Sequence, residues 1–139
     1  MQALYASGYA VAVPFGENVR YDLIIDDGER LSRVQCKTGR LRQGAVRFAT
    51  CSCYGHHARP LDSRRDYRGQ VDFFAVHCPE TLAVYLVPIE DVPVRAQAAL
   101  RVEPSRNGQR RHIRPAADYE IAEVSTRPTR APRATSGAR

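Results

Sequence analysis

The sequence predicts an α/β domain in which strands outnumber helices, and three observations support this fold class. First, residues 21–26 alternate between apolar and polar side chains, with the period of two that a half-buried strand requires. Second, residues 71–77 and 82–87 are apolar runs joined by a short connection that contains proline. Third, only residues 1–8 and 89–100 are expected to form helices, and both are short. The length of 139 residues fits one domain with a buried core.

The expected elements follow one another in a simple order along the chain. The helix over residues 1–8 ends at Gly8, because glycine commonly follows the last turn of a helix. Strands are expected at six places, over residues 9–15, 21–26, 31–38, 46–50, 71–77 and 82–87. The polar residues 27–30 predict a hairpin turn between the second and third of these strands. After the short helix over 89–100, residues 113–121 are expected to pack back onto the domain.

Two segments of the chain have a polar composition that predicts irregular structure. Residues 54–70 form a polar stretch with four arginines, and a loop of that length in a compact domain is usually functional or partly helical. From residue 125 onward the chain has neither an acid nor a large apolar residue. We therefore expect a folded domain over residues 1–124 and a disordered Arg/Pro-rich tail over residues 125–139.

The charge balance narrows the choice of partner. The net charge of +6 favours an anionic partner, most simply a phosphate backbone. The sequence shows no basic amphipathic helix of the kind that lies on a bilayer, and no apolar run approaches the roughly 20 residues that span one. The first 15 residues lack the positive leading segment of a signal peptide. We expect a cytoplasmic protein with no membrane partner, whose four cysteines are reduced.

The basic residues are strongly biased towards arginine. Of the 21 lysines and arginines, Lys37 is the single lysine. A lysine side chain supplies a compact ammonium with three donors, which a planar guanidinium does not replace. This bias draws attention to the strand that carries Lys37.

The hairpin register predicts which side chains lie beside Lys37. If residues 27–30 form the turn, Asp26 pairs with Leu31, and the same register places Asp22 opposite Gln35. Lys37 then lies two residues further along the same face. A polar cluster on strands that otherwise belong to the core is costly unless its members pair or bind something. One interpretation is a simple salt bridge between Asp22 and Lys37.

The alternative is a site for metal-assisted phosphodiester hydrolysis. Asp22 supplies a carboxylate oxygen, Gln35 an amide oxygen and Cys36 a backbone carbonyl, and Mg²⁺ prefers such oxygen ligands. A bound Mg²⁺ polarises the phosphate and lowers the pKa of a coordinated water. Lys37 would orient or deprotonate the attacking water, or stabilise the negative charge that develops on the phosphoryl group.

Five segments of the chain carry a resemblance to a known family: residues 14–22, 34–40, 67–76, 100–109 and 117–121. Together they resemble the PD-(D/E)xK nuclease superfamily. The branch most similar to them contains a cyanobacterial group I intron homing endonuclease and Holliday-junction-resolvase-like proteins. The resemblance implies a restriction-endonuclease-like α/β fold with a mixed central sheet, DNA as substrate and Mg²⁺ as cofactor. It also implies that Gln35 replaces the acid of the motif in this branch.

The chain departs from the family at its N-terminus. Members of the family begin with a helix whose acidic residue helps to complete the metal site, whereas this chain opens near the end of that helix and has no acid before Glu17. The expectations are a truncated first helix, a substitution by Glu17, or impaired metal binding. An impaired site would leave a DNA-binding module on the same fold.

Further expectations concern the partners of this domain. Six arginines flank the proposed site in the sequence and are candidates for phosphate contacts, namely Arg20, Arg40, Arg42, Arg47, Arg64 and Arg65. Because arginine is common throughout the chain, the alternative is that several of them are solvated surface. A zinc site formed by Cys51, Cys53, His56 and His57 is a third possibility, although the spacing matches no common zinc motif. A homo-oligomer, a dimer or larger, is expected because cutting both strands often uses two related copies.

Overall fold

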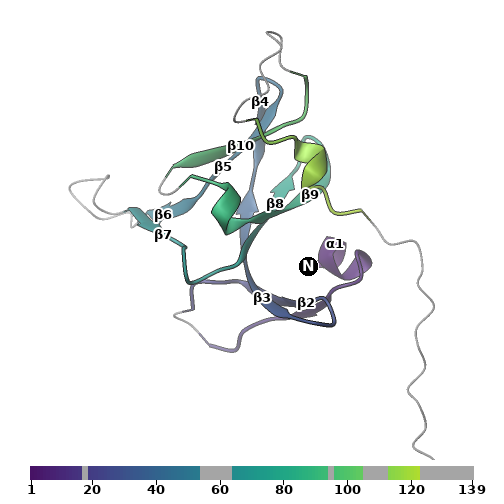
Figure 1. Cartoon of the computed structure of the whole chain (residues 1–139), viewed down its shortest axis with the longest axis vertical. Helices are drawn as coiled ribbons and strands as arrows, with labels where there is room; N and C mark the ends of the chain where they lie inside the picture. The colour runs from purple at the N-terminus through teal and green to yellow at the C-terminus, as the bar shows by residue number, and fades with distance from the viewer. Residues whose placement is uncertain (17–18, 54–63, 94–95, 105–112, 123–139) are drawn as a thin grey trace, which may run out of the picture.

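The computed structural model describes residues 1–16, 19–53, 64–93, 96–104 and 113–122 (Figure 1). The chain begins with helix α1 (Gln2–Ala6). Gly8 follows it with a φ of 93°, a conformation that glycine adopts without the cost a Cβ would add. The helix predicted over residues 1–8 is thus confirmed. The expected tail over residues 125–139 lies outside the described residues.

Five strands form the central sheet. They are β1 (Ala10–Ala12), β2 (Leu23–Asp26), β3 (Leu31–Thr38), β8 (Phe73–Cys78) and β9 (Ala83–Pro88), and this is also their order across the sheet. β3 pairs with β8 in parallel, and the other neighbours are antiparallel. The mixed central sheet of the predicted fold class is therefore confirmed. The first strand, expected over residues 9–15, is shorter than predicted.

Two smaller sheets complete the described strands. A three-stranded sheet has the order β10 (Gln97–Arg101), β5 (Ala45–Ala49) and β4 (Arg40–Arg42). A two-stranded sheet pairs β6 (Cys51–Cys53) with β7 (Arg64–Asp66). β4 continues from β3 through Gly39, so one stretch of chain passes from the central sheet into the three-stranded sheet.

The core has two parts, one on each face of the central sheet. Phe74 and Val76 of β8 pack in one cluster with Phe48 and Leu100 of the three-stranded sheet. On the opposite face α1 inserts Leu4 into a second cluster, whose buried members are Leu4, Leu23, Ile25, Val34 and Ala75. Successive residues of β8 thus point to opposite faces, as a strand requires.

The helix predicted over residues 89–100 was wrong. The structure has one 3-10 turn (Ile89–Asp91) and then strand β10, which pairs antiparallel with β5. Ala98 and Leu100 alternate with exposed or half-buried residues, so the pattern follows the strand period although these residues favour helices. The buried Thr50 hydroxyl fixes this segment, because it accepts a hydrogen bond from the Ala96 N–H at 3.1 Å and lies 2.7 Å from the Pro93 carbonyl oxygen.

The segment 113–121 packs against the body as predicted. Two backbone hydrogen bonds fasten it to β9, from Leu86 N–H to Tyr119 O at 2.8 Å and from Ile121 N–H to Val84 O at 3.0 Å. A short 3-10 helix, η2 (Ala116–Asp118), lies within this segment. Within the part of the chain that the structure describes, no helix has the length and apolar character needed to cross a membrane.

Candidate active site

The β2–β3 hairpin brings Asp22 and Gln35 together. Asp26 pairs with Leu31 and Leu23 with Val34, which is the predicted register. The Asp22 N–H extends the ladder by donating to Val34 O at 2.9 Å. As a result the Gln35 amide nitrogen donates to Asp22 Oδ2 at 2.6 Å. The two side chains that the sequence placed opposite each other are in direct contact.

The backbone of Cys36 joins the same cluster. Its N–H donates to Asp22 Oδ2 at 2.8 Å, and its carbonyl oxygen lies 3.4 Å from the Gln35 amide nitrogen. The Asp22 carboxylate, the Gln35 amide and the Cys36 carbonyl thus lie next to one another where β2 meets β3, and we call this cluster the metal point. A half-turn of the Gln35 amide about its last side-chain bond exchanges its nitrogen for its oxygen, which gives three oxygen donors at that point.

This donor set fits a magnesium ion. Octahedral Mg²⁺ with ligands at 2.0–2.1 Å has neighbouring ligand atoms about 2.9 Å apart. The observed separations of 2.6 Å and 3.4 Å from the Gln35 amide nitrogen lie on either side of that spacing. Asp22 is the charged member of this cluster, and the described residues contain no group of three or more His, Cys, Asp or Glu side chains that could hold a metal ion. Such a site suits an ion that keeps several waters, as Mg²⁺ does.

Lys37 shares this face of the sheet but reaches a different partner. In the parallel β3–β8 register Gln35 pairs with Phe74 and Lys37 with Val76, so both side chains lie on the Phe74 side. The Lys37 ammonium donates to Tyr67 Oη at 3.2 Å and lies 4.6 Å from the centre of that ring. None of the ion pairs among the described residues joins Lys37 to Asp22, so the salt-bridge interpretation does not match the structure.

Tyr67 is a residue that sequence reasoning did not assign to the site. It is 5% exposed and packs edge-on against Phe74, with ring centres 5.6 Å apart. Arg20 lies over the same ring at 4.4 Å and donates to the Asp66 carbonyl oxygen at 3.0 Å. The available signal was its place at the start of one family-like segment, residues 67–76. Nothing in that signal pointed to Lys37.

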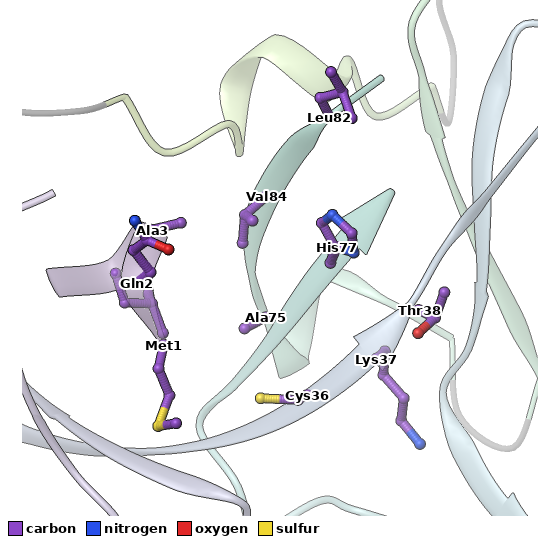
Figure 2. A pocket seen from close by; sticks show the side chains of 11 residues that line it. Met1, Gln2, Ala3, Cys36, Lys37, Thr38, Ala75, His77, Leu82 and Val84 are labelled. Carbon is purple, nitrogen blue, oxygen red and sulfur yellow. The ribbon is translucent and has the colours of Figure 1, made fainter. Parts of the chain in front are cut away.

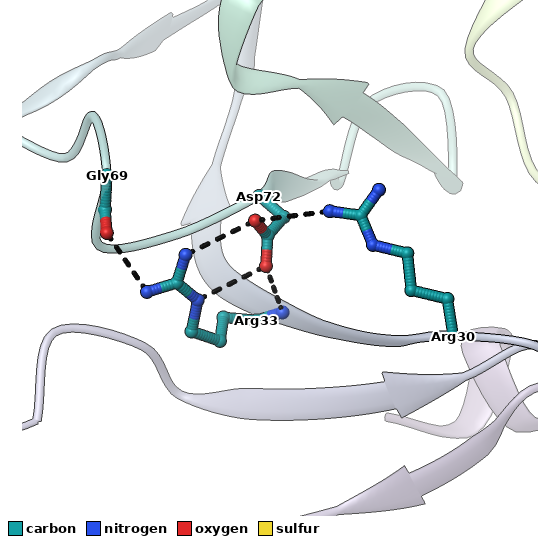
Figure 3. A network of polar contacts seen from close by, with 4 residues as sticks. All are labelled: Arg30, Arg33, Gly69 and Asp72. Atoms are coloured by element: carbon teal, nitrogen blue, oxygen red, sulfur yellow. Dashed lines mark hydrogen bonds and ion pairs between the residues drawn. The ribbon is translucent and has the colours of Figure 1, made fainter.

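A polar network anchors the connection that carries Tyr67 (Figure 3). Arg33 on β3 contacts both oxygens of Asp72, with Nε 3.2 Å from Oδ2 and Nη2 3.3 Å from Oδ1. The Arg33 N–H also donates to Asp72 at 2.8 Å, and its Nη1 donates to Gly69 O at 3.0 Å. Although partial burial raises the pKa of Asp72, the hydrogen bonds from Arg33 outweigh it and hold this pKa below its ordinary value. The network ties residues 67–72 to the strand that bears Gln35 and Lys37.

A pocket of about 540 Å³ lies on the opposite face of the central sheet. It is lined by residues of α1 and by the ends of β3, β8 and β9, including Met1, Cys36 and His77 (Figure 2). The Cys36 sulfur lies towards Met1, whereas the Lys37 side chain leads away from the α1 residues. Burial and the nearby Asp22 carboxylate raise the pKa of the Cys36 thiol, so this thiol stays protonated at neutral pH. Cys36 thus lines the pocket, while its carbonyl oxygen lies 3.4 Å from the Gln35 amide nitrogen.

The structure separates the six arginines proposed to contact phosphates. Arg40, Arg42 and Arg47 are exposed on the face of the three-stranded sheet that points away from the core. Arg40 pairs directly with Arg47 across β4 and β5. Arg101 of β10 shares this face, because Arg101 and Arg42 both pair with Ala45. The sequence-based predictions did not include Arg101.

The remaining three arginines lie elsewhere. Arg20 is half-buried and directed at Tyr67 and backbone carbonyls. Arg65 is exposed on β7, and for Arg64 only the strand backbone is described. In the proposed zinc site, Cys51 is buried on β6, whereas His56 and His57 fall outside the described residues, as does Glu17.

Comparisons with known proteins identify the family and the fold of this chain. A family model described as PD-(D/E)XK endonuclease matches residues 1–122. Among solved structures, the chain is similar to that of a bacterial homing endonuclease, I-Ssp6803I, with a TM-score of 0.63 and 23% sequence identity. The match covers 86% of this chain and 79% of that one, and at this identity it shows a shared fold. The predicted restriction-endonuclease-like fold is confirmed. No curated protein matches the sequence significantly.

Proposed function

The chain belongs to the PD-(D/E)XK endonuclease family, and on that premise we propose that it is a Mg²⁺-dependent endonuclease that hydrolyses phosphodiester bonds in DNA. The observation that carries the proposal is the cluster on one face of β3. Asp22, Gln35 and the Cys36 carbonyl meet at one point, with Asp22 Oδ2 2.6 Å and 2.8 Å from its two donors. Lys37 follows on the same face.

Each member of the cluster has a distinct proposed role. Asp22, Gln35 and the Cys36 carbonyl hold the metal ion, and Asp22 supplies the only full negative charge among them. When bound, Mg²⁺ supplies charge neutralisation at the phosphate and a more acidic water. The Lys37 ammonium orients the attacking water or stabilises the charge that develops on the phosphoryl oxygens. A point charge suits this role because it can follow the oxygens without a fixed planar geometry.

The exposed arginine face of the three-stranded sheet is the proposed DNA-contact surface. Arg40 and Arg47 are direct cross-strand neighbours whose like charges repel each other, and Glu80 Oε1, 3.8 Å from Arg40 Nη1, offsets only part of that positive charge. Arg42 and Arg101 extend the same face, because both pair with Ala45 between them. Positive charge gathered on one face of a sheet attracts a phosphate backbone, and it provides affinity without reading sequence.

Gly39 links this surface to the candidate active site. It separates Thr38 at the end of β3 from Arg40 at the start of β4. A Cβ at this position would lie 2.5 Å from Val46 Cγ1 and 2.9 Å from Val76 Cγ1, so only glycine fits between the two sheets. The chain passes from Lys37 to Arg40, the first residue of the arginine face, within three residues.

A nicking assay tests the proposal. Supercoiled plasmid and branched DNA are incubated with the protein and Mg²⁺, and nicked and linear products are measured. Cleavage that stops with EDTA and falls at least about a hundredfold in Lys37→Ala supports the enzyme, since such electrostatic groups contribute on this scale. Glu29→Ala, in the exposed β2–β3 turn, is the control that keeps full cleavage. Intact DNA under all conditions would overturn the proposal.

A second candidate is a DNA-binding module that does not hydrolyse. The observations in its favour are that the first turn of α1 has no acidic residue and that the described residues contain no group of three or more His, Cys, Asp or Glu side chains that could hold a metal ion. This candidate predicts salt-sensitive DNA binding in a gel-shift assay together with no cleavage in the nicking assay. Both candidates are compatible with a homo-oligomer, which light scattering of the purified protein measures directly.

A further inference from the structure

We propose that Tyr67 is a positioning residue that holds the Lys37 ammonium in place for DNA cleavage, an inference that rests on the proposed function. The Lys37 nitrogen contacts this residue in two ways, by a hydrogen bond to the hydroxyl at 3.2 Å and by its position 4.6 Å from the ring centre. A lysine side chain has four rotatable bonds and does not hold a fixed position by itself. Tyr67 supplies the fixed point.

Tyr67 is rigid because it is built into the core. Its side chain is 5% exposed, and its ring meets Phe74 at an angle of 89°. Its carbonyl oxygen accepts hydrogen bonds from Gln70 at 3.0 Å and Val71 at 3.1 Å, which closes a tight turn. The Arg33–Asp72 contacts then fasten this turn to β3, two residues before Gln35. The hydroxyl is therefore held at a constant distance from the strand that bears Lys37.

A second cation, the Arg20 guanidinium, also lies against the Tyr67 ring. The Arg20 guanidinium lies 4.4 Å from the centre of the same ring, and its Nη2 donates to the Asp66 carbonyl oxygen. Among the ion pairs of the described residues, neither Arg20 nor Lys37 has a carboxylate partner. Two cations beside one aromatic ring repel each other, and the ring and its hydroxyl offset that repulsion. The pair gathers positive charge at the Tyr67 ring, and its Lys37 member shares the face of β3 that bears Gln35.

The test compares Tyr67→Phe with Tyr67→Leu. Tyr67→Phe keeps the ring and removes the acceptor of the ammonium, whereas Tyr67→Leu removes both. In single-turnover cleavage we expect a rate about tenfold lower for Tyr67→Phe and lower still for Tyr67→Leu, as the loss of a hydrogen bond to a charged group implies. The DNA dissociation constant should change less than about twofold in Tyr67→Phe, because Lys37 remains present and charged.

Tyr85→Phe is the matched control. Tyr85 lies in the same core cluster, is 2% exposed, and has its hydroxyl 3.1 Å from the Thr81 hydroxyl. It thus loses a buried hydroxyl contact to Thr81, and it lies on β9, two strands across the sheet from Lys37, with Val76 of β8 between them. Full cleavage by Tyr85→Phe with a melting temperature lowered as much as in Tyr67→Phe supports positioning. An equal loss of cleavage in both variants assigns the effect to general stability and overturns the proposal.

The single lysine allows a second measurement that needs no enzyme activity. Selective ¹³C labelling of lysine gives one Cε–Hε signal in an NMR spectrum, because Lys37 is the chain's only lysine. We expect this signal to be displaced from the value of an unstructured lysine by the Tyr67 ring, and to return to that value in Tyr67→Leu. An undisplaced wild-type signal, or one unchanged in Tyr67→Leu, overturns the proposal.

Failure of the positioning proposal and failure of the proposed endonuclease function give different results. If the wild type cleaves DNA and Tyr67→Phe cleaves equally fast, the positioning role is wrong and the proposed function stands. If the wild type shows the displaced signal but never cleaves, the proposed function is wrong, and a positioning role in cleavage falls with it.

Discussion

Replacing Arg40, Arg42 and Arg47 together with glutamine should reduce the salt dependence of DNA binding. All three are exposed on one face of the three-stranded sheet, and the Arg40 side chain is 57% exposed although its Nη1 lies 3.8 Å from Glu80 Oε1. Each phosphate contact contributes about 0.9 to the slope of log affinity against log salt. Three contacts therefore make the slope about 2.7 units less steep in the variant.

That change in slope is large enough to measure by fluorescence anisotropy on a short duplex. Between 50 mM and 200 mM salt the wild type should lose about 40-fold more affinity than the triple variant. A variant with the same net charge, in which Arg30, Arg68 and Arg114 become glutamine, serves as the control. Those three arginines bond within the protein, to Asp72 and to the carbonyls of Val92 and Asp91.

The comparison between the two triple variants tests whether the exposed face of the three-stranded sheet contacts DNA. DNA contact by the exposed sheet is supported if the control variant keeps the wild-type slope and the variant lacking Arg40, Arg42 and Arg47 has a reduced slope. Equal slopes in both variants would mean that affinity follows net charge alone, and the assignment of this face would be refuted.

Three further predictions follow from single residues. Gly39→Ala should lower the free energy of unfolding in urea by about 1–3 kcal/mol through overpacking, and adding Val46→Ala should restore part of it; no loss would contradict the packing. Asp72→Asn should lower stability by about 1–3 kcal/mol at pH 7. Because the pKa of Asp72 is lowered in the folded protein, the stability difference between wild type and Asp72→Asn is fully present above about pH 4 and shrinks as the pH falls through the folded-state pKa of Asp72. A stability difference that does not depend on pH would contradict this prediction. Gln35→Glu adds a carboxylate beside Asp22 and should lower the Mg²⁺ concentration for half-maximal cleavage; an unchanged titration would contradict the ligand role.

The parts of the structure predicted from sequence are those that depend on local period and turn chemistry. The polar turn after Asp26 sets the hairpin register, and a register error of one residue would have moved Asp22 to the other face. For this reason the contact between Asp22 and Gln35 followed from the sequence. The family resemblance implied a mixed central sheet, but neither it nor any local pattern specified the parallel pairing of β3 with β8.

The parts that were missed depend on contacts between distant segments. Residues 97–101 favour a helix by composition, but pairing with β5 and burial of Ala98 and Leu100 make them a strand. The contact between Lys37 and Tyr67 joins residues 30 positions apart through the core. A polar network at Asp72 fixes that distance, and no spacing in the sequence encodes it.

Cleavage of supercoiled plasmid by the wild type and by Asp22→Ala, side by side in Mg²⁺, tests the central claim most directly. Asp22 contacts both Gln35 and the Cys36 N–H and carries the charge of the proposed metal site. We predict nicked and linear products with the wild type, and at most about 1% of that rate with Asp22→Ala, on the scale that metal-site charge contributes. DNA binding of the variant should be retained. Equal cleavage by the two proteins would contradict the account, because hydrolysis would then not depend on the Asp22 site.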